Sequence, residues 1–312
     1  MEKNPVNEYF ERRPDIVSFI IVIVHLTIVI GPLYISAVWG PGLHMIAAWL
    51  IFGLGMNGII NLMHECAHYL VFKNKPGSDI LGKFIIAPLL FTNFEIYRKR
   101  HWEHHKHLGV EGETKDAYLI DIKGQHIVFL LIRCLLMIEA VKKFFKQVRC
   151  IVSDTLYEKD HMWALRTMLI QIAFFLSLVS ASYAFGFNDW RLALRNAAIV
   201  YVFVYMYGVM SLTIFAADLR AIAEHQPYAD HDAHEGYAAL RNFKCTPFSR
   251  FIMGCYGFGE HYTHHKIPGI PYYALLKATK DLASQDGTLT PKKGYFQTIC
   301  EITKSSSQST SS

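Results

Sequence analysis

Charged residues are scarce in this chain. Only 18% of its 312 residues are Asp, Glu, Lys or Arg, whereas 52% are hydrophobic and 14% are aromatic. Ordinary soluble domains carry about a quarter charged residues, so the composition excludes such a domain and predicts a membrane protein. The formal net charge of +5 is a small excess, and it gives no support to nucleic-acid binding.

Long stretches of the chain lack lysine, aspartate and glutamate altogether. Residues 16–38, 43–63, 168–187 and 194–217 are apolar runs in which Arg195 is the only charged side chain. A helix of about 20 residues crosses the hydrocarbon core of a bilayer. The first run is longer than the core of a signal peptide and no small-residue cleavage site follows it, so we expect a retained anchor. The sequence therefore predicts an all-α membrane protein with four transmembrane helices in two hairpins.

Basic residues avoid the short connections within the two hairpins. Of the 31 lysines and arginines, all except Arg191 and Arg195 lie before residue 16, within residues 73–166 or after residue 219. Positively charged segments stay on the cytoplasmic side of a membrane. We therefore expect these regions to form a cytoplasmic helical cap, in a bacterial inner membrane or in the endoplasmic reticulum.

Two segments of the expected cap differ from the membrane spans. Residues 84–94 are apolar but too short to cross a bilayer, so we expect them to be buried or re-entrant. Residues 125–149 mix apolar and basic side chains, a pattern typical of a helix that lies in the membrane interface. We expect residues 1–304 to form a single domain. Seven of the eight residues in 305–312 are Ser or Thr, which predicts a disordered tail.

Histidines recur at spacings that place them on one face of a helix. Side chains three and four positions apart lie on the same face, and neutral imidazole binds iron, copper, nickel and zinc. This is more nitrogen than one tetrahedral zinc site uses, so the pattern predicts two metal ions. Nine of the 16 histidines belong to the pattern: His64, His68, His101, His104, His105, His225, His261, His264 and His265.

Three of these clusters resemble the three histidine boxes of the integral-membrane fatty acid desaturase and hydroxylase superfamily. The boxes read His64-Glu-Cys-Ala-His68, His101-Trp-Glu-His104-His105 and Gly259-Glu-His261-Tyr-Thr-His264-His265, and the resemblance covers residues 55–275. It implies a non-haem diiron centre that activates dioxygen and removes hydrogen from an unactivated hydrocarbon chain. It also implies that all nine patterned histidines are iron ligands.

The chain departs from one branch of that superfamily at Ala221. In stearoyl-CoA desaturases an Asn stands four residues before the histidine of the last ligand-bearing helix, which here is His225. One metal would lack that amide ligand, or water would replace it. The Ala-Glu-His form is similar to a bacterial-type branch.

Carboxylates near the boxes are candidates to orient the ligands, because a metal-bound imidazole usually donates its other N–H to a carboxylate or carbonyl. We assign no catalytic role to any of them. The candidates are Glu65, Glu103, Asp218, Glu224 and Glu260. We expect no metal role for the isolated histidines, which are His25, His44, His107, His126 and His161, nor for the pair His231 and His234.

Several activities remain open on the sequence. His64-Glu65-x-x-His68 also fits the signature of an intramembrane zinc metalloprotease, although that activity would leave seven patterned histidines idle. A metal transporter would place ionisable groups at mid-membrane, where the runs have almost none. Within the superfamily the resemblance favours desaturation of a fatty acyl chain, and hydroxylase, ketolase or acetylenase activity stays possible.

The chain has no recognisable means of supplying electrons. Its six cysteines include no C-x-x-C pair, and it contains no dinucleotide-binding fingerprint. We expect a separate electron donor, which is a ferredoxin or a cytochrome b5 with its reductase. The other expected partners are dioxygen, membrane lipid, and a lipid or acyl-thioester substrate.

Overall fold

The computed structural model describes residues 8–107, 127–153, 162–225 and 240–308. These residues are helical, and they form no β-sheet beyond an isolated bridge between Phe243 and Lys293. The all-α prediction is therefore confirmed for the described part of the chain.

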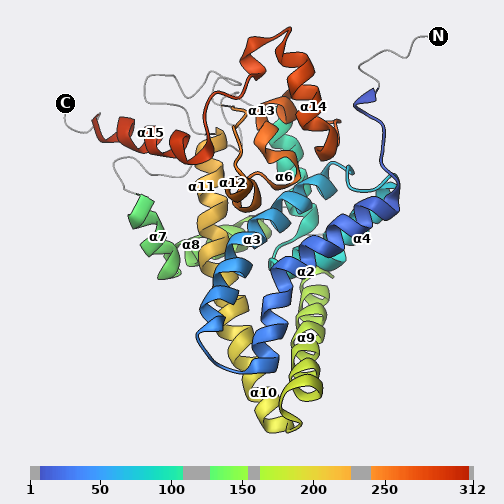
Figure 1. The fold of residues 1–312 in the computed structure, drawn as a ribbon, viewed down its shortest axis with the longest axis vertical. Coiled ribbons are helices and arrows are strands. Elements are labelled where there is room, and N and C mark those ends of the chain that lie inside the picture. The colour runs from blue at the N-terminus through green and yellow to red at the C-terminus, as the bar shows by residue number, and fades with distance from the viewer. Residues whose placement is uncertain (1–7, 108–126, 154–161, 226–239, 309–312) are drawn as a thin grey trace.

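Four helical stretches in the described residues are long and apolar enough to cross a membrane. They are Asp15–Trp39, His44–Ala67, Trp163–Phe187 and Trp190–His225. Three of the predicted apolar runs lie within these helices, and the run 43–63 starts one residue before the second helix. Helix α2 (Asp15–Trp39) packs along α3 (His44–Ala67) and α9 (Trp163–Ser182). In Figure 1 these helices form the long lower part of the molecule together with α10 (Trp190–Ile199).

Hydroxyl groups tie the first and third spans together inside the apolar bundle. Ser182 Oγ donates to the carbonyl of Ala37 at 2.7 Å, and Tyr34 Oη lies 2.6 Å from Ser177 Oγ. A hydroxyl group inside an apolar helix bundle needs a hydrogen-bond partner within the protein, because apolar side chains cannot accept its hydrogen bond. The contacts fix how α2 and α9 lie against each other.

The last span is not a uniform α-helix. After α10 it passes through two π-helical segments, η5 (Val200–Met206) and η6 (Val209–Thr213), and continues as α11 (Ile214–His225). The apolar run ends at residue 217, just before Asp218 and Arg220, and the helix continues beyond it to His225. This span therefore carries a patterned histidine at its end.

Two glycines allow the second and last spans to approach closely. A Cβ on Gly53 would lie 2.6 Å from Leu212 Cβ, and one on Gly208 would lie 2.8 Å from Phe52 Cδ1. Real Cβ atoms do not approach so closely, so the crossing of these spans requires glycine on both helices. This close crossing keeps the end of the second span, which carries His64, near the end of the last span, which carries His225.

A bent segment follows the second span. Helices α4 (Lys75–Leu81), η1 (Gly82–Ile86) and α5 (Ala87–Leu89) are followed, after a bend of 106°, by α6 (Phe94–Lys106). Asn93 begins α6, since its Oδ1 accepts from the backbone N–H of Glu95 and Ile96 at 2.9 and 3.1 Å. This cap sets the direction in which the second histidine box is presented.

The basic segment expected to be one interface helix is two helices. Helix α7 (Ile127–Leu135) and α8 (Ile138–Ser153) meet at Met137, whose φ is +58°. Lys143 Nζ donates to Asp218 Oδ1 at 2.8 Å and joins α8 to α11. The exposed side of α8 carries phenylalanines 144 and 145, each 62% exposed.

The C-terminal segment, residues 240–308, folds over the ends of the spans. It comprises α12 (Pro247–Ile252), η8 (Cys255–Glu260), α13 (His261–Lys266), α14 (Tyr272–Ala283), η9 (Gly287–Leu289) and α15 (Tyr295–Gln308), and α15 packs on α11. The predicted disordered tail, 305–312, overlaps the end of α15, and its last four residues lie outside the described part.

The helix crossing at Gly53 provides a test of the bundle. We expect Gly53→Ala to destabilise the protein by about 1–3 kcal/mol, because its methyl group overpacks the contact with Leu212. Gly31→Ala is the matched control, since nothing lies within 4 Å of a Cβ there. Melting temperatures in detergent compare the two variants, and equal values would contradict the close crossing.

Candidate metal centre

The nine patterned histidines converge from four helices. His64 lies in the last turn of α3 and His68 directly after it, while α6, α11 and α13 supply the others. One group has its ligand atoms within 4.8 Å of one another and contains His64, His68, His101, His105 and His264. A second such group contains His104, His225 and His265, and His261 adjoins it through His225.

Ring nitrogens in the first group face one another. His68 Nε2 lies 2.7 Å from His101 Nε2, which in turn lies 3.0 Å from His105 Nε2. His264 Nε2 is 3.3 Å from His105 Nε2. Nitrogens that bind one metal ion at roughly 2.1 Å are about 3 Å apart, so this spacing fits a shared metal.

The second group repeats this geometry beside the first. His225 Nε2 and His261 Nε2 are 3.0 Å apart, and the His104 ring centroid lies 4.9 Å from that of His225 and from that of His265. The rings of His105 and His265 stack at 4.3 Å and connect the two groups. Four helices thus surround two adjacent sets of nitrogens.

Several of these nitrogens are buried without a hydrogen-bond partner. They include His64 Nε2 and both ring nitrogens of His265. A buried polar atom without a partner costs free energy and calls for an explanation. Metal ions between the facing nitrogens provide one, and the nitrogen-rich donor set suits iron.

Burial keeps these imidazoles in the form that binds metal. Desolvation penalises the charged ring, and it is the main cause that lowers the pKa of His68, His261, His264 and His265 well below the ordinary histidine value. Neighbouring histidines lower the pKa further. The rings are therefore neutral near pH 7, with lone pairs available for a metal ion.

Two carboxylates contact the outward nitrogens of ligand candidates. Glu65 Oε1 is 3.2 Å from His64 Nδ1, and Glu224 Oε2 is 3.8 Å from His261 Nδ1. Tyr295 Oη donates to Glu224 Oε1 at 3.1 Å, which fixes that carboxylate. Of the other candidates, Glu103 pairs with Lys106 and His107, Asp218 pairs with Lys143, and Glu260 is buried.

Two asparagines of the second span position the third box, and the sequence assigned them no role. Asn57 Nδ2 donates to the carbonyl of Ile252 at 2.6 Å, and Asn61 Nδ2 donates to those of Met253 and Cys255 at 2.9 and 3.1 Å. These bonds hold the backbone just before η8 and at its first residue. An asparagine inside an apolar run was the available signal, because a buried amide needs a partner.

His25 holds the following turn. Its Nδ1 lies 2.8 Å from Tyr256 Oη, and the two rings stack at 5.3 Å. Tyr256 has φ of +52° and Gly257 has φ of +74°, conformations that a tyrosine adopts only when its surroundings hold it. Phe258 then contacts His64 at 4.6 Å between ring centroids. The turn therefore connects α2 to the histidine groups.

The structure also shows where Ala221 and the histidines outside the pattern lie. Ala221 stands one turn before His225 in α11, and its methyl group offers no ligand atom. His44 contacts Trp39, and His107 contacts Glu103, away from the two groups. The remaining isolated histidines, His126, His161, His231 and His234, lie outside the described residues.

The fatty acid desaturase family model matches residues 39–292, which is well over half of the chain. The chain belongs to the fatty acid desaturase family. The match contains all nine patterned histidines and confirms the resemblance of the three boxes. The zinc-protease alternative loses its basis, because His64 and His68 share one group with three further histidines.

Relatives of this family member include enzymes with different products. It is 25% identical to dihydrorhizobitoxine desaturase of Bradyrhizobium elkanii over 244 residues, and this alignment covers 75% of the chain and 66% of the relative. It is 22% identical to sn-1 acyl-lipid omega-3 desaturase (ferredoxin) of Nostoc sp. (strain 36) over 285 residues, and this alignment covers 86% of the chain and 76% of the relative. Beta-carotene 4-ketolase 3 of Haematococcus lacustris is 27% identical over 77 residues, or 24% of each chain.

The contact between His25 and Tyr256 predicts a coupled loss of stability. His25→Phe leaves the buried Tyr256 hydroxyl without its partner, so we expect a cost of about 1–3 kcal/mol. The double variant His25→Phe/Tyr256→Phe should cost little more than the worse single variant, because both remove the same bond.

Thermal unfolding of the single and double variants measures this coupling. His44→Phe serves as the control, since His44 begins α3 and contacts Trp39 at the end of α2 rather than Tyr256. Strictly additive losses at His25 and Tyr256 would show that the contact contributes nothing.

Proposed function

We propose that the protein is an oxygen-dependent membrane oxidoreductase that introduces a double bond into a fatty acyl chain. The convergence of nine buried imidazoles from four helices carries this proposal. Two bound iron ions would supply the oxidising power that removal of hydrogen from an aliphatic carbon requires. The overall change removes two hydrogens from the chain and reduces dioxygen to two waters, with two electrons and two protons from outside.

The chain's own residues hold and protect this centre. All nine histidines would be ligands, five of them in the first group and His104, His225, His261 and His265 in the second. Glu65 and Glu224 would orient His64 and His261 through their outward nitrogens. Burial of the rings limits access of water, which restricts side reactions of a strong oxidant.

Location and partners form part of the proposal. The four spans would cross the membrane as two hairpins, with the histidine groups on the cytoplasmic side where the basic residues gather. Electrons would come from a separate donor, a ferredoxin or a cytochrome b5 with its reductase. A relative whose name includes ferredoxin supports the former.

A second candidate is hydroxylation or ketolation at the same centre. The carotene ketolase relatives favour it: the match to Haematococcus lacustris covers only 24% of the chain, but that to Protosiphon botryoides covers 74% at 21% identity. These reactions use the same ligands and add oxygen to the substrate. The desaturase matches, at 25% identity over 244 residues and 22% over 285, are longer and more similar than the ketolase match over 235 residues, which favours double-bond formation.

Metal content tests the ligand assignment. We expect two irons per purified chain, and we expect His264→Ala to lose iron and turnover because it removes a nitrogen from the first group. His107→Ala should keep both, since His107 is 52% exposed and contacts Glu103 instead. Elemental analysis measures the iron, and one zinc per chain would contradict the assignment.

Product mass identifies the reaction. With lipid vesicles, dioxygen and a reduced ferredoxin or cytochrome b5, we expect acyl chains that are lighter by two hydrogens, and none when the donor is omitted. Lipid mass spectrometry detects the change. A gain of one oxygen would instead establish hydroxylation.

A further inference from the structure

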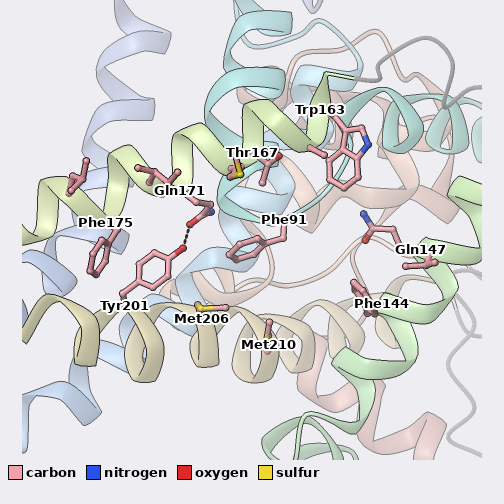
Figure 2. Close-up of a pocket in the computed structure, with 15 residues that line it drawn as sticks. Phe91, Phe144, Gln147, Trp163, Thr167, Gln171, Phe175, Tyr201, Met206 and Met210 are labelled. Carbon is pink, nitrogen blue, oxygen red and sulfur yellow. Dashed lines mark hydrogen bonds between the residues drawn. The ribbon is translucent and has the colours of Figure 1, made fainter. Parts of the chain in front are cut away.

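A large apolar cavity lies away from the histidine groups. Its volume is about 740 Å³, within the roughly 300–1,000 Å³ of ordinary ligand sites. Helices α8 and α9, segments η5 and η6 and the residues just after α5 surround it (Figure 2). Its walls include Phe144, Trp163, Met168, Phe175, Met206 and Met210.

The cavity is elongated and begins at one end of a membrane span. Figure 2 shows Trp163, Gln147 and Phe144 at one end, and Phe175 and Tyr201 at the other. Trp163 is the first residue of α9, and tryptophan favours the headgroup level of a bilayer. The long direction of the cavity therefore runs from the membrane surface into the apolar layer.

The two polar side chains deep in the cavity, Gln171 and Tyr201, are already bonded to the protein. Tyr201 Oη donates to Gln171 Oε1 at 2.6 Å, and Gln171 Nε2 donates to the carbonyl of Pro88 at 2.8 Å. They provide no spare group for a polar ligand deep in the cavity. Lipid-facing residues of α9 continue its edge, with Met168 52% and Leu176 55% exposed. An alkyl chain arriving from the bilayer fits this interior.

The residues that line this cavity are not those of the histidine groups. Among the described residues that line it, none is a histidine, and it shares no residue with the small cavity bounded by His64, His261 and His264. The cavity and the histidine groups are nevertheless connected through contacts between helices. The Lys143–Asp218 contact ties α8, which forms the cavity mouth, to the helix that ends at His225 two turns later.

We propose that this cavity holds the non-reacting acyl chain of a two-chain glycerophospholipid while its other chain reaches the metal centre. The inference rests on the proposed function and names the carrier of the acyl group. An acyl thioester has a single chain and would leave the cavity empty. Lys146, which is exposed on α8 and precedes the lining residue Gln147 in the chain, would provide a positive charge for a phosphate group.

Photolabelling tests occupancy without relying on catalysis. Metal-free and iron-loaded protein in nanodiscs is labelled with a diacyl phospholipid that carries a diazirine on one chain, and mass spectrometry maps the adducts. We expect labels on α8, α9 and η5. Ala164→Trp and Met206→Trp fill the cavity and should lose most of this label. Val202→Trp is the control, because it lies on η5 at 47% exposure but does not line the cavity.

Substrate comparison tests the role of the second chain. The wild-type protein should oxidise diacyl phospholipid in preference to lysophospholipid and acyl thioester. Met206→Trp should raise the KM for the diacyl substrate by about tenfold and leave turnover of the single-chain substrates unchanged, as expected for lost ground-state binding.

The outcomes separate this inference from the proposed function. Labelling of the cavity-filled variants at the wild-type level would overturn it, as would equal oxidation of all three substrates by wild type and variant. Loss of the label in these variants without oxidation of any lipid would instead contradict the proposed function.

Discussion

Imidazole nitrogens that face one another at 2.7–3.3 Å impose the main constraint on this structure. A neutral imidazole has one donor and one acceptor, so a buried group of facing nitrogens cannot satisfy all its members by mutual hydrogen bonds. The group is stable only with cations between the nitrogens or with a scaffold that holds the rings together. Four separate helices contribute the rings, and each must therefore be fixed in position and rotation.

The scaffold meets this constraint with polar contacts placed inside apolar helices. Asn57 and Asn61 bind the backbone ahead of the third box, and His25 holds the left-handed turn at Tyr256. Gly53 brings the second and last spans together where a larger residue would clash. None of these residues touches a metal ligand through its own side chain, yet together they determine where the boxes meet.

The sequence predicts those parts of the fold that a local pattern encodes. Apolar runs of helical length identify the four spans, and i, i+3 and i+4 spacing identifies eight of the nine histidines, whereas His225 stands alone in its helix. Contacts between distant segments have no such pattern, so the partners of His25, Asn57 and Asn61 could not be predicted. The break at Met137 and the cavity between α8, α9 and η5 depend on tertiary packing for the same reason.

The last span runs from Trp190 to His225, 36 residues in all. It stays helical throughout and changes from α-helix to π-helix only in η5 and η6. At 1.5 Å per residue it is roughly 54 Å long, whereas a hydrocarbon core is about 30 Å thick. This single span thus links Trp190 to a ring of the second group. A change in bilayer thickness changes the tilt of such a helix, and α11 would pass that change on to the imidazole of His225.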